Sequence, residues 1–464
     1  MNTQDTICAI ATAQGGAIGV IRISGKDAIA ITDRIFTPVG KHPLPLSERK
    51  AYTMAFGHIR QDDGEIIDEV LIGLFKSPHS YTGEDCVEIS CHGSSFILQQ
   101  VMQLLIRKGC RAAGPGEFTQ RAFLNGKMDL SQAEAVADLI ASSSAATHRM
   151  AMNQMRGGFS RELSALRERL LHLTSLMELE LDFSDHEELE FADRSELETI
   201  AGDIEKVISG LVHSFSVGNV LKNGIPVAIV GETNAGKSTL LNTLLNEEKA
   251  IVSDIHGTTR DVIEDTVNLS GITLRFIDTA GIRDTHDTIE NMGIARSFHK
   301  MEQAEIVLWV VDNTCAEAQI RQLSPRILPL CSNKQLIILL NKSDQVSAVP
   351  TKLSGLPENT VTLSISAKEK TGIQELQNLL VKTASVPELT SSDLIVTNVR
   401  HYEALSLALE DIHRVQNGLQ THLSGDFISQ DLRECLFHLA EIVGGEITAD
   451  EVLGNIFMKF CIGK

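Results

Sequence analysis

The sequence predicts a multidomain α/β protein in which an α+β domain precedes an all-α domain that an inserted α/β domain splits into two halves. Short β-rich runs with glycine turns fill the first part of the chain. Apolar residues recur with helical spacing from about residue 128 and again after about residue 393, and strands alternate with helices between these segments. We expect domains at residues 1–125, 126–221, 222–382 and 383–464, the second and fourth forming one helical domain.

The composition limits the classes of protein that the chain can belong to. Its 464 residues suffice for about three domains, and hydrophobic residues make up 43% of them but aromatic residues only 4%, which predicts aliphatic cores. The formal net charge of −20 argues against binding of nucleic acid through the overall electrostatic field. Any contact with nucleic acid therefore requires a local basic patch or a partner protein.

Cysteine usage and hydropathy indicate a cytoplasmic protein. The eight cysteines form no C-x-x-C pair, which argues against a zinc ribbon and favours reduced thiols. The N-terminus lacks the features of a signal peptide, and no apolar run approaches about 18 residues, so we expect no membrane span. The terminal "CIGK" matches a prenylation box poorly at its last two positions, so we expect no lipid anchor.

The first two segments differ in their sequence patterns. The runs "AIGVIRISG", "EVLIGLF" and "CVEISCHG" predict strands of an α+β domain. From "LSQAEAVADLI" onward the periodicity is helical, and Ser131 with Glu134 fits a capping box at the start of that helix. The acidic segment 183–198 is typical of a solvated connection between two helices.

The inserted segment carries five near-continuous apolar runs, as expected for parallel strands that are buried on both faces. These runs are "IPVAIV", "ITLRFIDT", "IVLWVVD", "LIILLNKSD" and "VTLSISA".

A phosphate-binding loop follows the first of these strands. The stretch "GETNAGKS" fits G-x-x-x-x-G-K-S and precedes a helical run. Glycines allow backbone N–H groups to surround phosphates at a helix N-terminus. Lys237 then contacts the β- and γ-phosphates, and Ser238 can ligate Mg²⁺.

Two further motifs complete the phosphate end of the site. "HGTTRD" offers Thr259 as a second hydroxyl ligand for Mg²⁺ and as a sensor of the γ-phosphate. "DTAG" ends a strand, so that Asp278 can hold a metal-bound water and the backbone of Gly281 can bond the γ-phosphate.

Two motifs select the base. In "NKSD", Asn341 and Asp344 end a strand, and a carboxylate there can accept the N1 and 2-amino hydrogens of guanine, which adenine lacks. "SAK" adds backbone contact to the guanine oxygen. The ordered set predicts a Ras-like P-loop GTPase domain. We expect GTP to contact Asn234, Ala235, Gly236, Lys237, Ser238, Thr239, Ser253, Thr258, Thr259, Asp278, Thr279, Ala280, Gly281, Asn341, Lys342, Asp344, Ser366, Ala367 and Lys368.

The residues do not show how water is activated. Ras-type domains place a glutamine after DTAG, whereas this chain has Ile282. The following segment offers Asp284, Asp287 and Glu290 as alternatives, and no arginine finger can be assigned.

The complete set of motifs resembles one family, the tRNA-modifying GTPases called MnmE or TrmE. The resemblance rests on "GETNAGKS", "SDIHGTTRD", "DTAGIRD", "NKSD", "TGEDCVEISCHG", "GEFTQRAFLNGKMDL" and "CIGK", and it covers the whole chain in order. It implies an N-terminal dimerisation and folate-binding domain, a divided helical domain, an inserted G domain and a homodimer. It also implies that, with the FAD-dependent partner MnmG (GidA), the protein adds a carboxymethylaminomethyl-type group to carbon 5 of the wobble uridine of certain tRNAs, using 5-formyltetrahydrofolate or a related tetrahydrofolate.

The resemblance also assigns the missing catalytic groups. It implies K⁺ stimulation through a cation bound by Asn234, Ser253, Ile255 and Thr258, and a water oriented by Glu290. The less favoured alternatives are that Asn234 is a loop-capping side chain and that Glu290 is a solvated charge.

The folate site and the reactive tail are likewise implied by resemblance. Folate contacts fall on Arg22, Glu88, Lys127 and Lys464, and Cys461 becomes a candidate reactive thiol. The chain departs from the family pattern at Glu232, Thr233 and His256.

Two alternatives remain open from the sequence. A ribosome-assembly GTPase switch would share the G domain, but it should carry a basic RNA-binding module, which the net charge of −20 does not support. A scaffold whose GTPase only regulates dimerisation is the other alternative.

Overall fold

The computed structural model divides the chain into two compact units. One comprises residues 1–141, 151–208 and 403–464, and the other comprises residues 142–150 and 209–402. The four domain boundaries expected from the sequence stay a prediction. The structure describes residues 5–13, 15–182, 194–248, 265–277, 301–332, 334–346, 356–357, 360–384, 394–445, 460 and 463.

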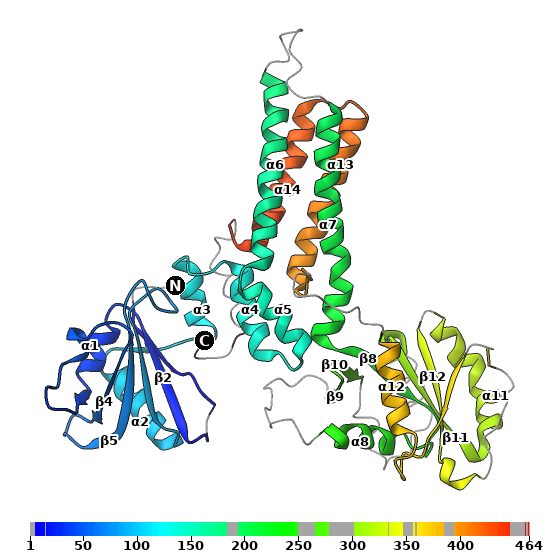
Figure 1. The fold of residues 1–464 in the computed structure, drawn as a ribbon, viewed down its shortest axis with the longest axis horizontal. Helices are drawn as coiled ribbons and strands as arrows, with labels where there is room; N and C mark the ends of the chain where they lie inside the picture. Colours follow the sequence, from blue (N-terminus) through cyan, green and yellow to red (C-terminus); the bar gives the residue numbers. More distant parts are fainter. Residues whose placement is uncertain are drawn as a thin grey trace. The chain divides into compact units, whose positions relative to one another are not determined.

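The N-terminal part is built on a seven-stranded sheet with the order β3-β4-β5-β6-β2-β1-β7. Figure 1 shows this sheet in blue, with β2, β4 and β5 labelled. Neighbouring strands are antiparallel except β1 and β7, which are parallel. The strands are β1 Ile7–Ile10, β2 Ile18–Ser24, β3 Phe36–Pro38, β4 Thr53–Arg60, β5 Ile66–Phe75, β6 Cys86–His92 and β7 Arg111–Ala112. The helices are α1 Ala28–Asp33, α2 Ser95–Arg107 and α3 Glu117–Leu124. The predicted α+β class is confirmed here.

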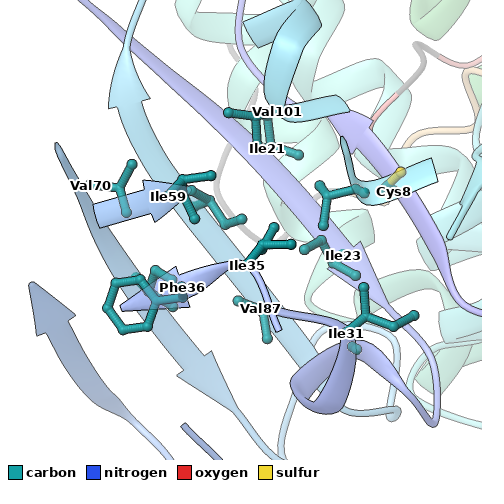
Figure 2. Close-up of a cluster of buried hydrophobic side chains, with 14 of the residues drawn as sticks. Cys8, Ile21, Ile23, Ile31, Ile35, Phe36, Ile59, Val70, Val87 and Val101 are labelled. Atoms are coloured by element: carbon teal, nitrogen blue, oxygen red, sulfur yellow. The ribbon is translucent and has the colours of Figure 1, made fainter. Parts of the chain in front are cut away.

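An aliphatic core fills one face of this sheet, as the composition predicts. Residues alternate between buried and more exposed positions along β5, so every second side chain enters the core. Figure 2 shows that isoleucines and valines from several strands meet side chains of the helices, among them Ile31 of α1 and Val101 of α2. The other residues labelled there are Cys8, Ile21, Ile23, Ile35, Phe36, Ile59, Val70 and Val87.

A buried guanidinium holds the start of the chain against α3. Arg121 is 3% exposed, and its Nη2 lies 2.7 Å from Asp5 Oδ1 and 3.1 Å from Glu117 Oε1. Its Nη1 lies 3.1 Å from Glu84 Oε1. Arg111 completes the network through Glu117 Oε1 at 2.5 Å. Burial raises the pKa of the Glu117 carboxyl, but hydrogen bonds from Arg111, the Gly114 amide and Arg121 lower it below its ordinary value.

In the described residues, six helices flank the inserted domain in sequence. They are α4 Leu130–Ala141, α5 Ala145–Met155, α6 Gly158–Asp182, α7 Arg194–Asn223, α13 Val399–Gln420 and α14 Gly425–Val443. Helix α14, from beyond the insertion, packs against α4 and α6. Leucines at helical spacing, such as Leu166 and Leu170 of α6 and Leu432 and Leu439 of α14, are buried. The two sequence halves thus form one helical domain, as predicted.

The prediction that Ser131 and Glu134 form a capping box at α4 was wrong, because the capping residue lies two positions earlier. Asp129, rather than Ser131, caps α4: its Oδ1 accepts from the Gln132 amide at 2.9 Å, and Gln132 Oε1 accepts from the Asp129 amide at 3.0 Å. Ser131 instead donates to Asp129 Oδ1 at 2.7 Å. An aspartate followed three residues later by glutamine supplies the same reciprocal bonds as the serine–glutamate pair, so both patterns were present and the earlier one prevails.

The inserted domain is built on a six-stranded sheet with the order β13-β12-β11-β8-β10-β9. All neighbours are parallel except the hairpin of β9 and β10. The strands are β8 Ile225–Val230, β9 Asp265–Leu269, β10 Ile272–Phe276, β11 Ile306–Asp312, β12 Gln335–Asn341 and β13 Val361–Ser364. The main helices are α8 Lys237–Glu248, α11 Ala316–Ile327 and α12 Ile373–Thr383.

Both faces of this sheet are covered, as the continuous apolar runs predict. Alternate residues of β11 enter two separate cores. Leu308 packs in the core that contains Leu240 of α8, and Trp309 packs in the core that contains Ile320 of α11. Helices α8 and α11 therefore lie on opposite faces of the sheet.

Two further expectations from the sequence concern membrane spans and cysteines. No helix in the described part of the chain is long and apolar enough to cross a membrane. The described cysteines, which are Cys8, Cys86, Cys91, Cys110, Cys315, Cys331 and Cys435, all carry free thiols.

Replacement of Arg121 by alanine should destabilise the N-terminal sheet by about 3 to 5 kcal/mol, because it removes a buried cation that the carboxylates of Asp5, Glu84 and Glu117 share. Hydrogen exchange of peptides from β1 and β2 should accelerate, whereas the emission of Trp309, buried in the inserted domain, should not change. The exposed Arg107→Ala is the matched control. Unchanged protection of β1 in Arg121→Ala would contradict the role given to this network.

Candidate functional site

The loop between β8 and α8 has the backbone that a phosphate site requires. Gly231 has φ +147°, and a Cβ there would lie 2.1 Å from the carbonyl oxygen of Val310. Gly236 has φ +99°, and its Cβ would lie 2.1 Å from Asn341 Nδ2. Asn234 between them is left-handed at φ +63°, which asparagine tolerates better than most residues. Both glycines of the motif are therefore required by space and by backbone conformation.

Lys237, the first residue of α8, lies across this loop. Its Nζ donates to the carbonyl oxygens of Gly231 at 2.8 Å and Glu232 at 2.7 Å. The helix that begins here carries no acidic residue in its first turn. A helix N-terminus, an ammonium group and glycine-rich backbone together favour an anion, which fits the phosphates of a nucleotide.

The side chain of Asn341 connects the phosphate loop to the predicted base-binding loop. It is 3% exposed at the end of β12. Its Nδ2 donates to the Ala235 carbonyl at 2.8 Å, and its Oδ1 accepts from the Ala367 amide at 3.0 Å. Thr243 of α8 adds a bond from its hydroxyl to the Ala367 carbonyl at 3.0 Å. The segments "GETNAGKS", "NKSD" and "SAK" are thus assembled into one site.

The carboxylate expected to read guanine is oriented by the same loops. Asp344 Oδ1 accepts from the hydroxyl of the buried Ser366 at 2.6 Å, and that hydroxyl in turn accepts from the Glu369 amide at 3.2 Å. Lys342 is left-handed at φ +65°, and its Nζ lies 2.5 Å from Asp312 Oδ2. Although burial raises the pKa of Asp312, hydrogen bonds from Lys342 and Thr314 lower it below its ordinary value, so this partner is ionised.

Several predicted site residues lie outside the described part of the chain. Those of the predicted GTP, Mg²⁺ and K⁺ sites are Ser253, Ile255, Thr258, Thr259, Asp278, Thr279, Ala280, Gly281 and Glu290. Those of the tail are Cys461 and Lys464. Their assignments stay predictions.

A second group of predicted site residues lies on the N-terminal sheet. Arg22 of β2 is paired in register with Glu88 of β6. The Nη2 of Arg22 lies 2.8 Å from Glu88 Oε1, and its Nε lies 2.9 Å from the same oxygen. The guanidinium carbon lies 5.6 Å from the Tyr81 ring centroid and 5.7 Å from that of Phe118, within the range of a cation–π contact.

Gly463, the second-last residue, contacts this pair through Arg22. Arg22 Nη1 donates to the Gly463 carbonyl at 3.3 Å. Gly463 has φ +96°, and a Cβ there would lie 2.6 Å from the Ile10 carbonyl oxygen at the end of β1. Lys127 is placed differently, because its Nζ donates to the Pro78 carbonyl at 2.9 Å. The structure thus brings together Arg22, Glu88 and the residue that precedes Lys464 in the sequence.

Three residues that support the two sites were not predicted from the sequence. Asp312 binds Lys342, and Tyr81 and Phe118 lie against Arg22. Asp312 ends the apolar run "IVLWVVD", and a lone carboxylate at the carboxyl end of a parallel strand was a usable signal. The two aromatic residues gave no such signal, because their contact with Arg22 arises only from the fold.

Two family models match the chain. The model "MnmE helical domain" matches residues 130–461, and the model "GTP-binding protein TrmE N-terminus" matches residues 6–127. Together they span nearly the whole sequence.

Curated relatives of full length are similar to this chain. A protein of Bacteroides thetaiotaomicron named tRNA modification GTPase MnmE is 66% identical over 99% of this chain and 100% of its own length. A protein of Flavobacterium johnsoniae with the same name is 52% identical over 100% of both chains. Among solved structures, Era of Aquifex aeolicus bound to GDP and aluminium fluoride is 28% identical over 40% of this chain and 66% of its own, with a TM-score of 0.27.

Replacement of Gly236 by alanine should abolish nucleotide binding. Alanine is strained at the positive φ of this residue, and its Cβ would displace the Asn341 amide. Titration with a fluorescent GDP analogue measures the effect. Gly271→Ala is the matched control, since Gly271 also has positive φ, at +85°, but an added Cβ meets nothing within 4 Å. The control should bind normally and lose about 1 kcal/mol of stability. Normal affinity in Gly236→Ala would contradict the site.

Proposed function

The chain belongs to the MnmE family of tRNA modification GTPases, and on that premise we propose that its GTP hydrolysis drives the addition of a carboxymethylaminomethyl-type group to carbon 5 of the wobble uridine of certain tRNAs. The observation that carries the GTPase half of this proposal is the buried Asn341 side chain. It holds the phosphate loop and the base-reading loop together at the carboxyl ends of β8 and β12.

GTP hydrolysis requires cations and a water-orienting residue around the phosphates, in addition to the loops that bind the nucleotide. We propose that Ser238 and Thr259 hold Mg²⁺, and that Asn234, Ser253, Ile255 and Thr258 hold K⁺. Asn234 fits this role because it is exposed at the turn of the phosphate loop and has the left-handed backbone that asparagine accepts. A cation bound there supplies positive charge where the transition state accumulates negative charge. Glu290 would orient the attacking water.

The N-terminal sheet is proposed to hold the tetrahydrofolate. Arg22 suits a carboxylate of the folate's glutamate portion, and Glu88 suits the pterin N–H groups. In the structure these two side chains satisfy each other at 2.8 Å, so a folate would exchange part of that ion pair for its own charged groups. Lys127 and Lys464 are the further proposed contacts, and Cys461 is the proposed reactive thiol of the tail.

The remaining chemistry requires partners. We propose a homodimer and a complex with an FAD-dependent MnmG protein in the cytoplasm. Because this chain has a net charge of −20, the partner would provide much of the attraction for tRNA. Hydride or electron transfer would belong to the flavin of that partner, while this chain would supply the folate pocket and the GTP-driven step.

Replacement of Na⁺ by K⁺ at constant ionic strength should raise GTP turnover by at least about tenfold, because the bound cation stabilises the transition state. Asn234→Ala should remove most of this stimulation. Turnover is measured by phosphate release at saturating GTP. Equal rates of the wild-type chain in the two salts would refute the K⁺ site.

Cys461→Ser should abolish wobble uridine modification and leave GTP turnover unchanged, because the thiol is proposed to act at the folate and not at the phosphates. Mass spectrometry of tRNA nucleosides from a complemented deletion strain measures modification. The exposed Cys315→Ser is the matched control and should be fully active.

Full modification in Cys461→Ser would remove the tail from the mechanism. If the deletion strain itself retained modified uridine but failed to mature ribosomal subunits, the assembly-switch alternative would replace the proposed function.

A further inference from the structure

The phosphate loop of this chain contains an acidic residue in an unfavourable place. Glu232 directly follows Gly231, and its own carbonyl oxygen accepts from the Lys237 ammonium at 2.7 Å. A carboxylate beside a nucleotide triphosphate repels it, most strongly where water is partly excluded. The site therefore needs something that fixes where this carboxylate lies.

Gln319 of α11 meets that need. Its Nε2 donates to Glu232 Oε2 at 2.8 Å, and its Oε1 accepts from the Asp312 amide at 2.9 Å. Gln319 is 8% exposed. Since a backbone amide can only donate and a carboxylate can only accept, this orientation of the glutamine amide is the one that satisfies both neighbours.

The face of the sheet on which Gln319 lies determines where the Glu232 carboxylate points. Helix α11 packs in the core with Trp309, whereas α8, whose first turn contains Lys237 and Ser238, packs in the core on the other face. The bond to Gln319 therefore directs the Glu232 carboxylate toward the α11 face, opposite the helix whose N-terminus begins the phosphate site.

The same glutamine also reaches the base-reading loop. Asp312, held through its amide by Gln319, receives the Thr314 amide on Oδ1 at 3.0 Å and the Lys342 ammonium on Oδ2 at 2.5 Å. A continuous set of contacts thus runs from Glu232 through Gln319 and Asp312 to Lys342, across the neighbouring strands β8, β11 and β12.

We propose that Gln319 is a positioning residue for guanine nucleotide binding, which holds the Glu232 carboxylate away from the phosphates and sets Asp312 to hold Lys342. It touches no nucleotide itself. Its two hydrogen bonds make an acidic phosphate loop compatible with a polyanionic ligand.

The test measures the affinity for a fluorescent GDP analogue in full-length protein, with choline chloride as the added salt so that K⁺ is not varied. Gln319→Ala should bind about tenfold more weakly at low ionic strength, and the loss should shrink as salt screens the released carboxylate. Glu232→Gln in the same chain should recover most of the affinity. Gln322→Ala, an exposed position on α11, is the matched control.

A swapped pair separates positioning from general damage to the fold. Gln319→Glu alone should weaken binding, because it sets two carboxylates against each other. The double variant Glu232→Gln/Gln319→Glu keeps an amide facing a carboxylate and an acceptor for the Asp312 amide, so its affinity should return to that of the wild-type chain or exceed it. If Gln319→Ala does not fold, the comparison of Gln319→Glu with the double variant tests the proposal in its place.

Wild-type affinity in both Gln319→Ala and Gln319→Glu would overturn the proposal. A loss in either that Glu232→Gln does not reduce would also overturn it, because the glutamine would then act only through the stability of the fold.

Discussion

A single buried amide, that of Asn341, sets the geometry on which the GTP site depends. It joins the carbonyl of Ala235 to the amide of Ala367 and thereby fixes the distance between the phosphate end and the base end of the site. Buried polar groups that lack partners are costly, so the Ala235 carbonyl and the Ala367 amide both depend on the Asn341 side chain. The close approach also explains Gly236, since no Cβ fits beside the Asn341 amide. The two loops are thus joined into one recognition element.

In the N-terminal domain, charged side chains likewise join segments that are distant in sequence. Arg22 and Glu88 meet because β2 and β6 are antiparallel neighbours in a fixed register. In the same domain, Arg121 is buried and binds Asp5, Glu84 and Glu117. Glu117 and Arg121 belong to "GEFTQRAFLNGKMDL", one of the runs on which the resemblance to the family rests, and the structure gives that run a physical role. It joins Asp5 to α3, and Phe118 of the same helix lies against Arg22.

Much of the inserted domain could be predicted from the sequence, because its information is local. Apolar runs such as "IVLWVVD" and "IPVAIV" coincide with β11 and β8, and the motif glycines specify the phosphate loop. Strand β9 was missed because it carries polar residues and lies at the edge of the sheet, where β10 is its one neighbour among the described strands. The helix cap at Asp129 was missed because two capping patterns overlap within two residues.

The parts of the sites that escaped prediction depend on contacts between residues distant in sequence. Glu232 and Gln319 are 87 residues apart, and neither residue type suggests the other. Arg22 and Glu88 look like ordinary surface charges in isolated strands, so only resemblance marked them before the register of β2 and β6 placed them together.

The most direct test of the account is the wobble uridine content of tRNA in a strain whose only copy of the chain carries Asn341→Asp. This change keeps the acceptor for the Ala367 amide but replaces the donor to Ala235 with a buried carboxylate oxygen, which should weaken GTP binding by roughly a hundredfold. We expect uridine without its carbon-5 substituent. Fully modified tRNA, together with failed GTP binding by the purified variant, would contradict it.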